Sequence, residues 1–212
     1  MHELPELPLH SFDKEVLIVT DYIEVFEQNS IKISTRMGNI YVDPFHVPEE
    51  FHDAALILLT HDHYDHFSIE DIAFVANPDS VLVVPEKMLD KAAKARDFVK
   101  DIRTVIPGTF QQIAGVEINT VPAYNIMKPF HPKSAGWVGY IINIDGKRIY
   151  IAGDTDATKE AKAVKCDIAL VPIGGTYTMD AKKAAELINE IHPEVAIPIS
   201  SPIESLLKRL IC

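Results

Sequence analysis

A histidine-rich stretch, Thr60-His61-Asp62-His63-Tyr64-Asp65-His66, directly follows the continuous apolar run at residues 55–60. An apolar run of this length is typical of a strand that is buried on both faces. Side chains two residues apart in an extended segment point the same way, so His61 and His63 can bind the same metal ion. Asp65 and His66 follow where the chain turns, and they can reach a second ion nearby. The stretch therefore predicts a metal centre at the end of a buried strand.

The residue types in this stretch favour a divalent transition metal. Imidazole is the commonest side-chain ligand for such ions near neutral pH. Two ions about 3.5–4 Å apart can stabilise both sides of a displacement, and a bound ion lowers the pKa of water to about 7. Because the set contains no thiolate, we expect one or two ions of Zn²⁺ or Mn²⁺. Asp65 is the predicted catalytic residue, since its carboxylate can hold the attacking water and relay a proton.

Strands and helices are expected on both sides of the stretch. Before it, short apolar segments separated by turns predict an antiparallel start to a sheet. Ser68 then follows as a helix N-cap, with Asp71 as a partner that resembles a capping box, and Asp145-Gly146 is a strong hairpin signal. The expected strands are 16–20, 22–27, 31–35, 40–43, 55–60, 81–84, 103–106, 110–113, 116–121, 137–144, 147–152, 167–173 and 195–199, and the helices after the one at Ser68 are 86–96, 158–164 and 180–191.

The same order of elements occurs twice along the chain: antiparallel strands come first, and strands that alternate with helices follow. Both blocks can bury their apolar faces if two sheets pack face to face with helices outside. The expected fold class is therefore α/β, a four-layer αββα sandwich of two mixed sheets. A chain of 212 residues with 47% hydrophobic and 24% charged residues suits a single globular domain, residues 1–212.

Composition narrows the partners and the compartment. With 20 Lys+Arg and 31 Asp+Glu the formal net charge is −11, which argues against nucleic acid as the main partner. No apolar run approaches the roughly 20 residues that span a bilayer, so no membrane span is expected. The two cysteines, Cys166 and Cys212, cannot form a disulfide framework, which favours a reducing, cytoplasmic setting.

Four motifs together resemble the metallo-β-lactamase fold superfamily of metal-dependent hydrolases. The pattern His61-x-His63-x-Asp65-His66 after a buried strand is highly specific for that superfamily. Three further segments resemble its other strand ends and active-site loop, and they extend the similarity over most of the chain: Tyr41-Val42-Asp43-Pro44, Ile151-Ala152-Gly153-Asp154-Thr155 and Val171-Pro172-Ile173-Gly174-Gly175. The nearest subgroup is similar to ascorbate-phosphate lactonases and to the N-acyl-phosphatidylethanolamine phospholipase D type.

The resemblance implies an activity and roles for several residues. It implies a hydrolase in which metal-activated water attacks a small ester, lactone or phosphodiester substrate. Asp154 would bridge the two ions with one oxygen for each, and Gly153 before it permits a close approach of the backbone. Asp43 is expected to hold a ligand histidine, and Thr155 to form hydrogen bonds locally or behind the ligands.

The region between the histidine motif and Asp154 departs from the superfamily pattern. A third histidine for the first ion is expected after a strand there, but Asn125 stands near that place. His131 is the one histidine between His66 and Asp154, so we expect it to be the third ligand, and Asn125 is the alternative through its weaker oxygen. The remaining candidates are expected to shape the pocket or to attract a small anionic substrate: Tyr124, Lys128, Lys133 and Tyr177.

The end of the last strand departs from the pattern more sharply. The superfamily presents a histidine there as a ligand of the second ion, whereas this chain has Ser200 after 195–199. Neutral serine is a poor ligand for a divalent transition metal, so we expect Asp65, His66 and Asp154 to hold the second ion more weakly. The domain is expected to be incomplete or altered after residue 199. The alternative function is therefore a metal-binding protein with impaired or no catalysis.

Overall fold

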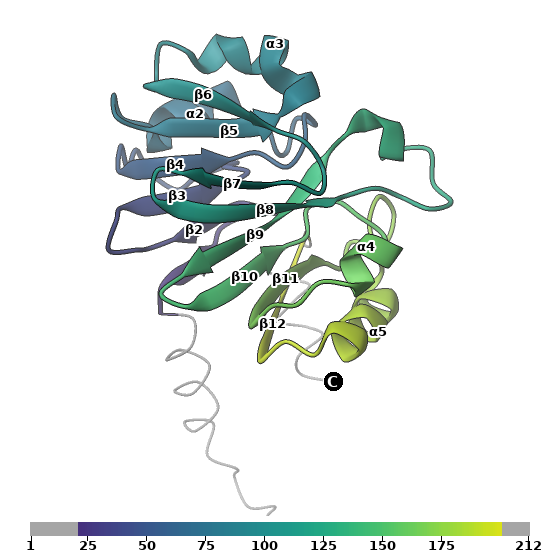
Figure 1. Cartoon of the computed structure of the whole chain (residues 1–212). Coiled ribbons are helices and arrows are strands. Elements are labelled where there is room, and N and C mark those ends of the chain that lie inside the picture. Colours follow the sequence, from purple (N-terminus) through teal and green to yellow (C-terminus); the bar gives the residue numbers. More distant parts are fainter. Residues whose placement is uncertain (1–20, 201–212) are drawn as a thin grey trace, which may run out of the picture.

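The computed structural model describes residues 21–200, which fold into two six-stranded sheets. Figure 1 shows the two sheets packed together, with helices on the outer side of each. The four layers confirm the predicted αββα sandwich of two mixed sheets. The strand predicted at 16–20 and the segment after Ser200 lie outside the described residues, so the predictions of an altered ending and of a single domain over 1–212 remain predictions.

The first sheet has the strand order β1-β2-β3-β4-β5-β6. Strands β1 to β3 are antiparallel, and β3 to β6 are parallel. Short turns join the antiparallel strands, whereas parallel neighbours need longer crossover connections. The strands are β1 Ile23–Val25, β2 Ile31–Ile33, β3 Asn39–Val42, β4 Ala54–Leu58, β5 Val81–Pro85 and β6 Asp101–Val105.

The second sheet has the strand order β12-β11-β10-β9-β8-β7. Strands β7 to β10 are antiparallel, and β10 to β12 are parallel. Asp145 and Gly146 have φ angles of 49° and 82° and join β9 to β10, which confirms the predicted hairpin. The strands are β7 Phe110–Ile113, β8 Val116–Pro122, β9 Val138–Ile144, β10 Lys147–Ile151, β11 Ile168–Pro172 and β12 Val195–Ile199.

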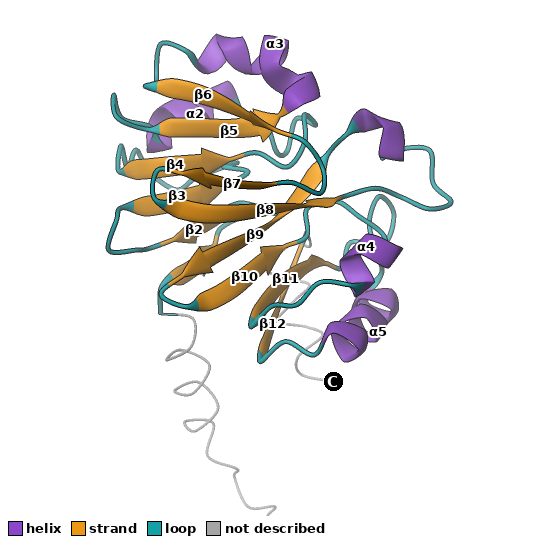
Figure 2. Ribbon diagram, viewed as in Figure 1, coloured by secondary structure: helices purple, strands orange, loops and turns teal. Residues whose placement is uncertain are grey.

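Helices cover the outer faces of the sheets (Figure 2). Ser68 begins α2 (Ile69–Val75) by accepting from the Asp71 amide at 3.2 Å. Only half of the expected capping box forms, because the Asp71 carboxylate accepts from the Val47 amide instead. The helix predicted at 86–96 is three short pieces, Glu86–Met88, α3 Leu89–Ala92 and Ala93–Ala95, and none of the three begins with a side-chain cap. On the other sheet lie α4 (Lys159–Lys162) and α5 (Ala181–Ile191).

Apolar side chains form three separate layers of core. The layer between the sheets joins residues of both, such as Leu56 and Ile142. The outer layers join each sheet to its helices, through residues such as Ile72 on α2 and Leu187 on α5. Burial on both faces explains why the central strands are continuously apolar. None of the helices between residues 21 and 200 combines the length and the apolar character needed to cross a bilayer.

The carboxyl ends of the parallel strands open at one end of the sandwich, at the right of Figure 1. The loops that follow β3, β4, β10 and β11 begin at this end, and β12 ends there just before Ser200. The β1–β2 turn and the long β8–β9 loop lie there too, since β1 runs parallel to β3 and β8 parallel to β10. Side chains from six separate connections, and from Ser200 at the end of β12, can therefore meet at one place.

Candidate metal centre

The predicted ligands are far apart in the sequence but meet at this end of the sandwich. Residues 61–66 follow β4, Asp154 follows β10, and His131 comes from the β8–β9 loop. A short turn between β4 and α2 carries the whole histidine motif, because His66 and Phe67 both donate their amides to the His63 carbonyl. The structure thus brings all six predicted ligands together: His61, His63, Asp65, His66, His131 and Asp154.

Three imidazole rings converge on one point. His61, His63 and His131 each offer a ring nitrogen, and these three atoms lie within 4.8 Å of one another. The ring centroids are separated by 4.7 Å for His61 and His63, 4.8 Å for His63 and His131, and 5.2 Å for His61 and His131. Trp137 packs beside all three rings, at centroid distances of 4.9–5.3 Å. Three converging imidazoles are a ligand set that suits a tetrahedral ion with one open position.

His61 is oriented by its neighbour Thr60. The Thr60 hydroxyl donates to Asp43 Oδ2 at 2.5 Å, so its oxygen accepts from His61 Nδ1 at 2.9 Å. His61 Nε2 then carries the lone pair, and this buried atom has no hydrogen-bond partner among the described residues. A buried acceptor without a partner costs about 1–3 kcal/mol. An ion bound at this atom would remove that cost, so the residue fits a metal site.

Asn125 orients His131 in the same way. Asn125 Nδ2 donates to the Tyr177 carbonyl at 3.0 Å, which turns its Oδ1 towards His131 Nδ1 at 3.1 Å. His131 Nδ1 is therefore the donor, and Nε2 is left with its lone pair. That Nε2 lies 3.4 Å from Asp154 Oδ2 but forms no hydrogen bond within residues 21–200. The Asn125 oxygen lies behind the ring of His131, on the side away from the converging nitrogens.

A second cluster lies beside the three imidazoles. His66 Nε2 is 3.5 Å from Asp154 Oδ1 and 3.8 Å from Asp65 Oδ2. The other oxygen of Asp154, Oδ2, lies 3.4 Å from His131 Nε2 and 4.0 Å from His61 Nε2. The two oxygens of Asp154 thus face different clusters, which is what a carboxylate shared by two ions needs.

Asp43 holds both clusters from behind. It is fully buried, and its carboxylate accepts from His66 Nδ1 at 2.7 Å, from the Thr60 amide at 2.7 Å and from the Thr60 hydroxyl. Asp43 also forms a compact group with His61 and His66 whose ligand atoms lie within 4.8 Å of one another. Because its oxygens already accept three hydrogen bonds, we interpret it as the residue that orients these histidines.

Burial and charge set the protonation of the histidines. Burial, assisted by neighbouring imidazoles, holds the pKa of His61 well below its ordinary value and lowers the pKa of His63. Burial also acts to lower the pKa of His66, but Asp154 and Asp43 outweigh it and raise that pKa to about 9. Neutral imidazole is the form that binds metal. His61 and His63 are therefore ready ligands, whereas an ion at His66 has to displace a proton.

Gly153 brings the end of β10 close to the histidine loop. Its φ angle is +64°, and a Cβ at this position would lie 3.1 Å from the Thr60 Cβ. Only glycine combines this backbone conformation with so close an approach. Thr155, two residues on, is buried; its Oγ1 accepts from the Tyr124 amide at 3.1 Å and lies 2.9 Å from the Asp156 carbonyl. These contacts place Thr155 in local hydrogen bonding, where it fixes the loop that carries Asp154.

Comparison with known proteins agrees with this geometry. Residues 22–200 match the family described as the beta-lactamase superfamily domain. The chain belongs to the beta-lactamase superfamily. A UPF0173 metal-dependent hydrolase from Pyrococcus abyssi is 33% identical over 174 residues, which cover 76% of each chain. Another from Methanosphaera stadtmanae is 32% identical over 202 residues, covering 84% of this chain and 82% of its own.

A solved structure of a protein from Parabacteroides distasonis, titled as a metal-dependent hydrolase, is similar with a TM-score of 0.73 and 28% identity. It covers 89% of this chain and 87% of its own. The superfamily and the general activity predicted from the histidine motif, a metal-dependent hydrolase, are thus confirmed. The finer resemblance to lactonases and phospholipase D-type enzymes stays a prediction.

The candidate centre opens into a cavity. Its volume is about 380 Å³, and its walls combine predicted metal ligands with aromatic side chains: His63, Tyr64, Asp65, Phe130, Asp154 and Tyr177. Phe130 and Tyr177 meet edge to face, with ring centroids 4.7 Å apart. The rim is exposed, since Tyr64 and Tyr177 are 80% and 54% accessible. Tyr177 therefore lies in the wall of this cavity.

The Lys128 side chain forms hydrogen bonds with other parts of the protein. Its ammonium group donates to Asp156 Oδ1 at 3.1 Å, to the Gly175 carbonyl at 3.3 Å and to the Thr178 carbonyl. These contacts tie the β8–β9 loop to the loop after β11. Lys128 does not line the cavity, so its observed role is to join two loops.

Lys133 and Tyr124 also have other partners. Lys133 Nζ donates to Glu160 Oε1 at 2.7 Å, and the Tyr124 hydroxyl donates to Glu160 Oε2 at 2.8 Å. The Lys133 ammonium lies 4.7 Å from the centre of the Tyr124 ring. These two hydrogen bonds outweigh the effect of partial burial and lower the pKa of Glu160 to about 2. Neither Lys133 nor Tyr124 lines the cavity.

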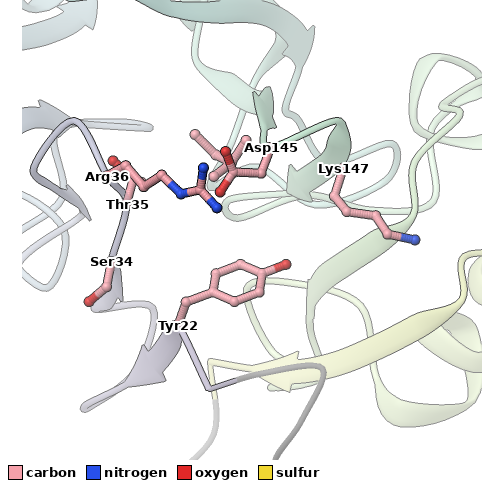
Figure 3. A pocket seen from close by; sticks show the side chains of 7 residues that line it. Tyr22, Ser34, Thr35, Arg36, Asp145 and Lys147 are labelled. Carbon is pink, nitrogen blue, oxygen red and sulfur yellow. The ribbon is translucent and has the colours of Figure 1, made fainter.

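A second cavity, of about 360 Å³, lies at the opposite end of the sandwich, where β1 and β10 begin. Figure 3 shows the Arg36 guanidinium directed towards Asp145 there, with Tyr22 and Lys147 nearby. Within residues 21–200, both groups of side chains that could hold a metal ion lie at the end of the sandwich that carries the first cavity. The candidate centre is therefore assigned to the end that carries the histidine motif.

Sequence reasoning missed one residue of the centre, Asn29. It belongs to the β1–β2 turn, is 1% exposed, and donates through Nδ2 to Asp154 Oδ1 at 2.8 Å. No local pattern marks this asparagine, since it is 125 residues from Asp154 and 37 from His66. Only the packing of the two sheets brings it to the site.

Proposed function

We propose that the chain hydrolyses a small ester, lactone or phosphodiester by means of one or two divalent ions held at this centre. His61, His63 and His131 would hold the first ion. Asp65, His66 and Asp154 would hold the second, with Asp154 shared between the two. The observation that carries the proposal is the convergence of three imidazoles, two of which direct buried and unpartnered Nε2 atoms at one point.

The ion chemistry and the ligand types agree. Bound ions would act as Lewis acids and lower the pKa of a water to about 7. Three imidazoles suit Zn²⁺, whereas a site with more carboxylate oxygens suits Mn²⁺ as well. Both of the predicted metals therefore remain candidates.

Asp65 is the proton-transfer residue of the proposal. It lines the cavity, its side chain is 28% exposed, and it lies 3.8 Å from His66 Nε2. A carboxylate at the boundary between the metal cluster and the cavity can accept a proton from water and pass it to a leaving group. Asp43 and Thr60 serve this chemistry indirectly, by fixing the rings of His61 and His66.

The cavity walls favour a substrate with an apolar, planar group beside the scissile bond. Tyr64, Phe130 and Tyr177 present aromatic surface at the opening. The anionic substrate expected from Lys128 and Lys133 has less support, because both ammonium groups are paired with carboxylates outside the cavity. We therefore propose an aromatic or otherwise apolar ester, lactone or phosphodiester as the preferred class.

The assignment of His131 over Asn125 can be tested by metal affinity. We expect His131→Ala to weaken binding of the first ion by more than about 100-fold, because it removes one of three ligands. Asn125→Ala should weaken it by about 10–100-fold, the usual effect of losing a hydrogen bond behind a ligand. Trp137 is the single tryptophan of the chain, and quenching of its fluorescence by Co²⁺ measures this binding. A larger loss for Asn125→Ala would make Asn125 the ligand.

The alternative, a metal-binding protein with impaired catalysis, is favoured by one observation. Ser200 stands at the end of β12, where the superfamily pattern has a histidine, and no hydrogen bond joins its side chain to the ligands within residues 21–200. Loss of one ligand could leave a bound ion without turnover.

Metal removal and reconstitution distinguish the two functions. Chelated protein, and protein loaded with Zn²⁺ or Mn²⁺, would be assayed on aryl esters, aryl-substituted lactones, bis-p-nitrophenyl phosphate and the matching alkyl compounds. We expect turnover only after loading, with aryl compounds preferred over alkyl ones. Loaded protein that binds its ions but turns over none of these compounds would support the alternative.

A further inference from the structure

Asn29 occupies a position beside the second cluster that the proposed function leaves unexplained. Its side chain is 1% exposed, and Nδ2 lies 2.8 Å from Asp154 Oδ1 and 3.2 Å from His66 Nε2. Its own oxygen, Oδ1, is buried and has no hydrogen-bond partner among the residues described. The β1–β2 turn therefore presents one terminal atom of an amide to two of the proposed ligands of the second ion.

The β1–β2 turn also contacts Ser200, which stands where the superfamily pattern has a ligand histidine. The Ser200 amide, at the end of β12, donates to the Gln28 carbonyl at 2.8 Å. Asn29 is the next residue along the turn. Hence the residue that replaces the expected histidine lies directly beside the residue whose amide reaches into the cluster.

The separations match those between neighbouring ligands of one ion. Ligand atoms at about 2.0–2.2 Å from an ion are about 2.8–3.6 Å from each other at octahedral or tetrahedral angles. The Asn29 Nδ2 position is 2.8 Å and 3.2 Å from two such atoms, Asp154 Oδ1 and His66 Nε2. An amide nitrogen cannot bind the ion, but the two ends of the amide have nearly the same shape. Rotation of the amide by half a turn would place Oδ1 where Nδ2 now lies.

We propose that Asn29 is a ligand of the second metal ion, through Oδ1, in place of the histidine that Ser200 replaces. In the structure the amide donates from Nδ2 to the Asp154 carboxylate; to bind an ion it would turn so that Oδ1 takes that place. The inference rests on the proposed function, because it requires an ion at Asp65, His66 and Asp154.

The added ligand also changes which metal the second site prefers. With Asn29 the site contains one imidazole nitrogen and oxygens from Asp65, Asp154 and the amide. Oxygen-rich sets suit Mn²⁺ better than the three imidazoles of the first site do. The two sites should therefore differ in preference, with Zn²⁺ favoured at the first and Mn²⁺ at the second.

Cobalt titration of two variants tests the proposal without an activity assay. Quenching of Trp137 reports the first equivalent of Co²⁺, since that ring lies beside the three histidines. In Asn29→Cys, a thiolate bound directly to Co²⁺ would give an intense near-ultraviolet charge-transfer band with the second equivalent. In Asn29→Ala, the second equivalent should bind at least about 10-fold more weakly, while the first changes less than about two-fold. Circular dichroism of both variants checks that they fold.

Asn143→Cys is the matched control, since Asn143 is exposed on β9 and contacts Glu117 away from the centre. It and the wild-type chain should bind two equivalents without a new band. Two bound equivalents in Asn29→Cys with no thiolate band, or unchanged second-site affinity in Asn29→Ala, would overturn the proposal. A wild-type chain that binds one equivalent only would also overturn it and leave the proposed function standing. A chain that binds no Co²⁺ at all would refute the proposed function itself, and this inference with it.

Discussion

Replacing Asp65 by asparagine is expected to lower kcat by about 10²–10⁴-fold on whichever compound the loaded chain hydrolyses. This range is typical for the loss of a general acid–base group. Asparagine keeps the shape and one oxygen of the side chain, so it preserves contact with the second cluster better than alanine would. It cannot take up a proton, which is the step assigned to this residue at the wall of the cavity. The measurement is steady-state kinetics at saturating metal, with metal content determined in parallel.

Asp62→Asn is the control for that measurement. Asp62 belongs to the same loop, but its carboxylate pairs with Lys91 Nζ at 2.9 Å and does not line the cavity. We expect its kcat to stay within about two-fold of wild type, because surface pairs of this kind contribute little. If Asp65→Asn with a full complement of metal were as active as Asp62→Asn, proton transfer would have to be assigned to another group.

Replacing Asp43 by alanine is expected to lower the free energy of unfolding of the metal-free chain by about 3–5 kcal/mol. The carboxylate is fully buried and pairs with His66 Nδ1 at 2.7 Å. Its loss would leave the charged His66 imidazole and both Thr60 donors without their acceptor. Removal of one partner from a buried, hydrogen-bonded pair is among the largest single-residue effects on stability. Urea unfolding in the presence of a chelator measures the change.

The matched control is Asp79→Ala. The Asp79 side chain is 90% exposed, and its nearest cation is Lys100 at 3.6 Å. The free energy of unfolding should change by no more than about 0.5 kcal/mol there. A loss below about 1 kcal/mol for Asp43→Ala would show that the hydrogen-bond network around Thr60 is dispensable for the fold, and its role would then be confined to metal binding.

Local patterns predicted the elements because their causes are local. Asp145-Gly146 adopts the two positive φ angles that a tight hairpin needs, and Ser68 caps α2 through the neighbouring Asp71 amide. The prediction for residues 86–96 is less accurate. The helical composition of this segment indicates one helix, but the chain forms three short helical pieces without side-chain caps. Composition describes a tendency, whereas the boundaries of an element depend on contacts that form only in the folded chain.

The predicted pocket residues show more clearly how far prediction from the sequence reaches. Lys128 and Lys133 suggest a positive patch as long as their partners are unknown. In the structure, Asp156 and Glu160 take up the two ammonium groups, 28 and 27 residues away along the chain. A charged residue in a sequence predicts that it attracts a group of opposite charge. Which group that is depends on the loops that pack beside it in the folded chain.

By itself, the sequence indicated which residue types stand at the candidate centre, because His61, His63, Asp65 and His66 follow a buried apolar strand within a few residues of one another. The tertiary structure decided which atom of each side chain faces the centre. Thr60 and Asn125 select the free nitrogen of His61 and His131, and the packing of the first sheet on the second brings Asn29 to Asp154. These contacts join residues from separate loops and sheets. Their geometry depends on how whole sheets stack, which spacing along the chain does not encode.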